Sequence, residues 1–110
     1  MPAGTTDQPD WFTATPMSVP DGELAFSKSG EQFEVEINNG AMGFEDFYAA
    51  VSDGTPADAF QIEPTSGTLN RRGQDPTYIS IKYMGGAKGD DFHLVVQTEE
   101  EKWSFKITLP

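Results

Sequence analysis

Four segments of the chain alternate strictly between apolar and polar residues: 32–38, 78–83, 92–98 and 102–109. Alternate side chains along a β-strand point to the same side, so each segment predicts a strand with one buried and one solvated face. Such half-buried strands are typical of antiparallel sheets, because parallel sheets are covered on both faces and have continuous apolar strands. The four predicted buried sets are Phe33, Val35 and Ile37; Ile79, Ile81 and Tyr83; Phe92, Leu94 and Val96; and Trp103, Phe105, Ile107 and Leu109.

Weaker patterns predict further strands at residues 15–19, 23–28 and 59–63, which turn-forming Gly, Pro and Asn residues separate from their neighbours. Residues 43–51 fit a helical stripe and a strand equally well on their own. The spacing of about ten residues between short strands, which is typical of β-sandwiches, favours a strand there. We therefore predict an all-β fold, an antiparallel immunoglobulin-like β-sandwich of seven to eight strands.

The length of 110 residues fits one domain, and eight Phe, three Tyr and two Trp can supply its core. We expect residues 1–13 to form a flexible N-terminal segment and residues 14–110 to form the sandwich. Trp11 and Phe12 stand at this boundary. Large aromatic residues are mostly buried, so we interpret the pair as a plug over a sheet edge, and an exposed anchor for a partner is the alternative.

The charge balance excludes several classes of partner. Seven Lys and Arg residues against 18 Asp and Glu residues give a net charge of −11, which repels nucleic acids and anionic membranes. No apolar run reaches the roughly 18 residues that a membrane-spanning helix needs, so we expect no membrane insertion. The chain has no cysteine, which excludes thiolate chemistry and fits a reducing compartment. We expect an intracellular, cytoplasmic protein, and an organelle is the alternative.

One segment resembles a known family. Residues 60–69 read Phe-Gln-Ile-Glu-Pro-Thr-Ser-Gly-Thr-Leu, which resembles the Phe-x-Ile-x-Pro-x-x-Gly-x-Leu signature of PapD-like immunoglobulin-type sandwiches, in particular the major-sperm-protein (MSP) and ASH domains. Pro64 offers no N–H and ends a strand, and Gly67 allows a tight reversal after it. Phe60, Ile62 and Leu69 can then meet in one core. The resemblance implies a non-catalytic protein-interaction domain in a cytoskeletal, ciliary or scaffold setting.

The residues themselves offer little for catalysis. His93 is the only histidine, and its parity places it on the outward face of its predicted strand. No Gly-x-Ser-x-Gly motif is present to supply an activated serine beside it. We therefore predict a surface histidine, no enzyme activity and no cofactor.

Charged loops are the remaining candidates. The acidic groups lack the spacing of a calcium-binding loop, so we expect no metal site; a weak site for a divalent ion or small ligand is the alternative function. Arg71 and Arg72 form the only pair of adjacent basic residues and can contact a carboxylate or phosphate group. We expect a monomer that binds a protein partner with a basic patch. The predicted partner-binding residues are Arg71, Arg72, Asp90, Asp91, Glu99, Glu100 and Glu101.

Overall fold

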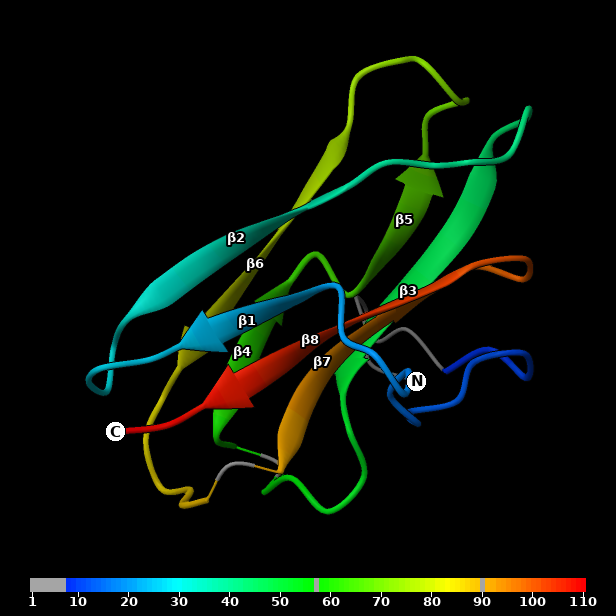
Figure 1. The fold of residues 1–110 in the computed structure, drawn as a ribbon. Coiled ribbons are helices and arrows are strands. Elements are labelled where there is room, and N and C mark those ends of the chain that lie inside the picture. The colour runs from blue at the N-terminus through cyan, green and yellow to red at the C-terminus, as the bar shows by residue number, and fades with distance from the viewer. Residues whose placement is uncertain (1–7, 57, 90) are drawn as a thin grey trace, which may run out of the picture.

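The computed structural model describes residues 8–56, 58–89 and 91–110, and within these ranges it contains strands and no helix. The strands form two stacked sheets (Figure 1), which confirms the predicted all-β sandwich. The elements are β1 (Gly22–Ala25), β2 (Gln32–Ile37), β3 (Glu45–Val51), β4 (Phe60–Glu63), β5 (Ser66–Leu69), β6 (Thr77–Tyr83), β7 (Phe92–Gln97) and β8 (Lys102–Thr108).

The larger sheet has the strand order β1-β8-β7-β3-β5, and the smaller sheet has the order β2-β6-β4. β1 runs parallel to β8, with Leu24 opposite Ile107, and the other pairs are antiparallel. β4 and β5 are consecutive in the chain but belong to different sheets, and the chain crosses between them at the cis peptide bond Glu63–Pro64. Pro64 has no N–H to continue the pairing with β6, so the smaller sheet ends there.

The structure confirms some of the predictions made from the weaker sequence patterns and contradicts others. Residues 43–51, which were ambiguous, contain strand β3, as the sandwich spacing predicted. Residues 15–19 form no strand, and Val19 is 77% exposed. The tight reversal predicted at Gly67 is also wrong, because Gly67 lies inside β5 opposite Phe47 and has no positive φ. Glycine is required there for close approach: a Cβ would lie 3.0 Å from the Phe47 ring.

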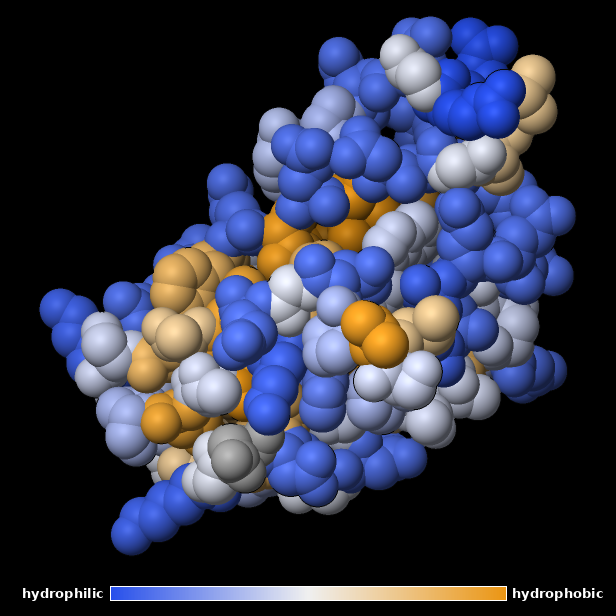
Figure 2. Space-filling model, in the orientation of Figure 1, coloured by the Kyte–Doolittle hydropathy of each residue, from blue (hydrophilic) through white to orange (hydrophobic). Residues whose placement is uncertain are grey.

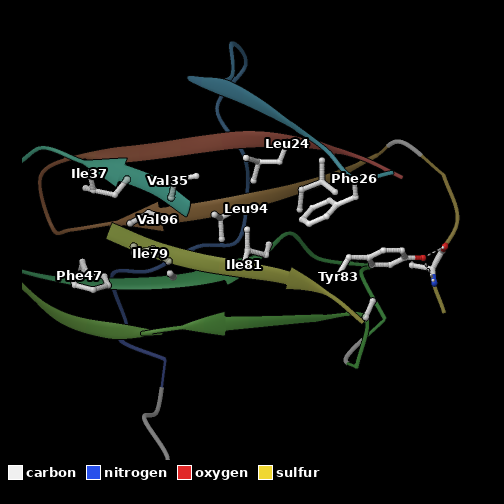
Figure 3. Packing of buried hydrophobic residues seen from close by; sticks show 14 of the residues in the cluster. Leu24, Phe26, Val35, Ile37, Phe47, Ile79, Ile81, Tyr83, Leu94 and Val96 are labelled. Atoms are coloured by element: carbon white, nitrogen blue, oxygen red, sulfur yellow. Dashed lines mark hydrogen bonds between the residues drawn. The ribbon is translucent and has the colours of Figure 1, made fainter. Parts of the chain in front are cut away.

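The predicted buried faces meet between the two sheets (Figure 3). Ile37, Ile79, Ile81, Leu94 and Ile107 are at most 1% exposed. The signature residues meet as expected, since Leu69 is buried and Phe60 and Ile62 pack half-buried against the same cluster. This burial is the main favourable contribution to folding of a chain that has no disulfide.

The outer face of the larger sheet is not the solvated surface that alternation predicted. Val95 and Ser104 point to this face, yet both are fully buried, because residues 11–17 cross over it. The Met17 N–H donates to Ser104 Oγ at 3.0 Å, and Gln97 Nε2 donates to the Trp11 carbonyl at 2.8 Å.

Phe12 anchors this crossing segment. Its side chain is 3% exposed and meets the Tyr48 ring edge to face at a centroid distance of 4.9 Å. This confirms the plug interpretation for Phe12, while Trp11 is half-buried. The packed part of the chain therefore includes residues that the sequence pattern placed in the N-terminal segment.

Candidate protein-interaction site

Three loops gather at one end of the sandwich: residues 38–44 between β2 and β3, residues 70–76 between β5 and β6, and residues 98–101 between β7 and β8. The first two reach the upper right of Figure 1, and the third lies to the right below them. Antiparallel pairing explains this gathering, because connections that follow β2, β5 and β7 leave their sheets at the same end.

Asn39 joins two of these loops. Its side chain is 8% exposed and donates from Nδ2 to the carbonyls of Gly43, at 2.8 Å, and Asn70, at 3.0 Å. Its Oδ1 accepts the Ala41 N–H at 2.9 Å. A buried side-chain amide that is hydrogen-bonded to three backbone groups holds the backbone around it in one arrangement. Residues 38–44 and 70–76 therefore form one structural unit.

The first loop also contacts the other two loops through its backbone. The Arg72 N–H donates to the Ala41 carbonyl at 3.0 Å, and the Gly40 N–H donates to Glu101 Oε2 at 3.0 Å. Residues 38–44 consequently lie between the basic pair on one side and the three glutamates on the other.

Acidic side chains dominate one part of this end. Partial burial and the nearby carboxylates of Glu100, Glu99, Glu101 and Asp46, in that order, raise the pKa of Glu45 above its ordinary value. Glu45 is half-buried at the start of β3 and has the same parity as buried Phe47 and Ala49. The other four carboxylates therefore lie close enough to Glu45 to disfavour its ionised form.

Apolar side chains project beside these acids. Met42 is 73% exposed and Phe44 is 60% exposed. The guanidinium carbon of Arg71 lies 5.4 Å from the centroid of the Phe44 ring, which is a cation–π arrangement. We call this surface the acidic loop end; it comprises Met42, Phe44, Glu45, Asp46, Arg71, Arg72, Glu99, Glu100 and Glu101. Figure 2 shows its surroundings as mostly hydrophilic, with a small weakly apolar area at the tip.

The structure thus brings together most of the predicted partner-binding residues. Arg71, Arg72 and the three glutamates lie at the acidic loop end, on separate loops that residues 38–44 connect. Asp91 directly precedes β7 and therefore lies at the opposite end, and Asp90 lies outside the described residues. Sequence analysis missed Met42 and Phe44. The exposure of Phe44 could have been predicted from the alternation of β3, because Phe44 has the opposite parity to buried Phe47 and Ala49.

His93 lies near the opposite end, in a pocket of about 180 Å³ lined by Ala14, Thr15, Pro16, Ser52, Asp53 and Asp91. Ser52 Oγ accepts the backbone N–H of His93 at 3.0 Å, and the Ser52 N–H donates to the His93 carbonyl at 2.8 Å. The Ser52 hydroxyl thus helps to hold β7 against the end of β3. Within residues 8–56, 58–89 and 91–110, no three His, Asp or Glu side chains gather closely enough to hold a metal ion.

No protein-family model matches the sequence, and no curated protein matches it. Solved structures do match the fold. WR4, an MSP family member of C. elegans, aligns with a TM-score of 0.64 and 10% identity, over 81% of this chain and 92% of that protein. The CupB2 chaperone of Pseudomonas aeruginosa aligns with a TM-score of 0.55 and 12% identity, over 79% of this chain and 53% of the chaperone. PapD-like domain 7 of human CEP192, an ASH/PapD-like domain, aligns with a TM-score of 0.51 and 14% identity, over 100% of this chain and 96% of that domain.

The fold is that of the MSP and PapD-like β-sandwiches. The resemblance inferred from residues 60–69 is therefore confirmed at the level of fold. In this fold, Pro64 marks the point where the chain passes from the smaller sheet to the larger one. The described part of the domain also contains no helix with the length and hydropathy needed to cross a bilayer.

Proposed function

We propose that this MSP/PapD-like domain is a non-catalytic protein-interaction module that binds a basic partner through the acidic loop end. Its fold is shared with an MSP family member and with an ASH/PapD-like domain of human CEP192. The observation that carries the proposal is the exposure of Met42 and Phe44 beside the carboxylate of Glu45 and the four carboxylates close to it.

The two kinds of side chain have different roles in this interaction. Phe44 and Met42 supply apolar area that becomes favourable once a partner removes it from water, and aromatic residues and methionine are enriched at interfaces. The carboxylates attract lysine and arginine side chains of the partner over a distance, which raises the association rate and makes it sensitive to salt. Arg71 lies over one side of the Phe44 ring and leaves more than half of the residue exposed.

The charge also bears on the state of the free protein. A net charge of −11 opposes the approach of a second copy, so we expect a monomer. We place the domain in the cytoplasm, because a chain without cysteine fits a reducing compartment.

The apolar part is tested with a matched pair of variants in an affinity capture from native lysate. Phe44→Ser removes the aromatic side chain from the acidic loop end, and Val19→Ser removes an apolar side chain that is 77% exposed elsewhere. We expect captured proteins to be lost with Phe44→Ser and retained with Val19→Ser. Equal recovery with both variants would contradict the proposal, whatever proteins are captured.

The electrostatic part uses a second pair. Glu99→Gln with Glu100→Gln removes two charges from the acidic loop end, and Glu23→Gln with Glu34→Gln removes two exposed charges elsewhere. We expect the first double variant to weaken capture at low salt and to lose most of its salt dependence, while the second behaves as the unmodified chain. Capture that ignores both ionic strength and the first double variant would exclude a basic partner at this surface.

A further inference from the structure

A groove of about 370 Å³ borders strand β5 and includes Asp46, which also belongs to the acidic loop end. Its walls include Pro9 and Trp11 from the N-terminal crossing, Asp46 and Tyr48 from β3, and Gly67 and Thr68 from β5. Tyr48 and Asp46 have the same parity and lie opposite Ser66 and Thr68, so the groove opens on the outer face of the larger sheet.

Among the strands of residues 8–56, 58–89 and 91–110, β5 lies at the edge of the larger sheet, next to β3. The Ala49 N–H donates to the Thr65 carbonyl at 2.8 Å, which sets the alternation of hydrogen-bonded pairs along these strands. Phe47 therefore exchanges backbone hydrogen bonds with Gly67, and the N–H and C=O of Thr68 point away from β3. These two groups have the geometry that an additional strand would need.

The composition of β5 also differs from the other sheet edges. Among the described strands the edges are β1, β2, β4 and β5, and the first three each contain at least one glutamate. β5 reads Ser-Gly-Thr-Leu and has no charged residue and no proline. Proteins commonly protect exposed edges with such residues, because an unprotected edge is a template for another strand.

We propose that β5 accepts an extended basic peptide segment of a partner protein as an additional strand. The peptide backbone pairs with the N–H and C=O of Thr68. Lysine or arginine side chains on its outer face reach Asp46, and their methylene groups pack on Trp11. A partner of this charge is favoured over a second copy of the chain, since each copy has a net charge of −11. This site shares Asp46 with the acidic loop end but does not include Met42, Phe44 or the three glutamates.

The test is an NMR titration of the full ¹⁵N-labelled chain with a short synthetic peptide of alternating lysine and valine. We expect shifts at the amides of Gly67, Thr68 and Leu69 and at the Trp11 indole. A glutamate–valine peptide, and a lysine–valine peptide methylated at alternate backbone nitrogens, should not bind. The methylated peptide keeps the side chains and removes the strand pairing, so this arm does not depend on a protein variant folding.

Variants then locate the hydrogen bonds. Thr68→Pro removes the outward N–H and also the hydroxyl that donates to Asp46 Oδ1 at 2.9 Å, and we expect it to weaken peptide affinity about tenfold or more. Thr68→Val lacks the same hydroxyl and therefore isolates the effect of the N–H. Gln32→Pro, at the start of edge strand β2 on the other sheet, and Thr68→Val, which keeps the N–H, should bind normally. Asp46→Asn should weaken binding most at low salt.

Four results would overturn the proposal: no binding, shifts confined to residues 38–44 and 98–101, normal binding by Thr68→Pro, or a doubling of the mass in solution through β5. It also fails if deletion of residues 1–7 alone shifts the Thr68 and Trp11 signals and raises peptide affinity, since the chain's own N-terminus would then be the occupant. Shifts confined to residues 38–44 and 98–101 would leave the proposed function standing while excluding the β5 site.

Discussion

The contribution of the N-terminal crossing to stability can be measured by replacing its anchor. Phe12→Ala removes a ring that is 3% exposed and that packs edge to face on Tyr48. Phe44→Ala is the matched control, because it makes the same chemical change at a residue that is 60% exposed. The two variants differ only in what the ring contacts.

The expected loss follows from the burial of the ring. Removing a buried phenylalanine side chain costs about 3–5 kcal/mol of unfolding free energy, including the aromatic pair. Phe12 lies in the outer layer, where neighbouring side chains can partly close the gap, so we expect the lower end, about 3 kcal/mol. That is a large fraction of the roughly 5–15 kcal/mol that stabilises a typical domain. Phe44→Ala should change stability by less than about 0.5 kcal/mol.

Urea unfolding followed by tryptophan fluorescence gives both values, and thermal unfolding gives an independent check. A loss of about 3 kcal/mol should lower Tm by roughly 10 °C or more in a domain of this size. If Phe12→Ala and Phe44→Ala unfold within about 0.5 kcal/mol of each other, the crossing segment adds nothing to the fold and the burial argument is wrong.

Three further predictions concern the acidic loop end. Thr98 is fully buried and its Oγ1 accepts the N–H groups of Glu100 and Glu101, so Thr98→Val should cost about 1–3 kcal/mol by urea unfolding; Thr98→Ser, which keeps the oxygen, should lose clearly less. The folded-state pKa of Glu45 is raised, so the ionised carboxylate opposes folding and stability falls as pH rises past its ordinary value of 4.5. Glu45→Gln should therefore be more stable than the unmodified chain at neutral pH, with a difference that vanishes in acid, and Glu23→Gln should show no such gain. Millimolar calcium should leave Tm within about 1 °C, and a rise of several degrees would revive the divalent-ion alternative.

Alternation alone predicted β2, β6, β7 and β8 and their buried faces, because a two-residue period is a local property of the chain. It could not predict that Val95 and Ser104 are buried on the opposite face. Their cover comes from residues 11–17, which have no periodicity of their own. A segment that lies across a sheet needs only to fill space, so its sequence need not repeat.

The two strands that depend on tertiary context were harder. β3 has a pattern that also fits a helix, and the expected spacing of the sandwich decided it. β5 has one buried apolar residue, Leu69, and its Gly67 looks like a turn residue. Only the packing of the Phe47 ring shows that glycine is needed there because a side chain would collide with that ring.

The candidate site was partly predictable for a related reason. Charge drew attention to Arg71, Arg72 and the three glutamates, but nothing local indicates that loops so far apart in sequence share one surface. The sheet order and the Asn39 bonds bring them together. Phe44 belongs to the helical stripe that residues 43–51 also fit, and its exposure depends on where β3 begins.

The position of Asn39 affects how mutational maps of this domain should be interpreted. An alanine scan of residues 38–44 would identify Asn39 as a hot spot for any ligand of this end, although the side chain is too buried to touch one. The loss would arise from the displacement of Gly43 and Asn70. Pairing each alanine variant with a measurement of amide exchange in both loops would separate true contacts from such indirect effects.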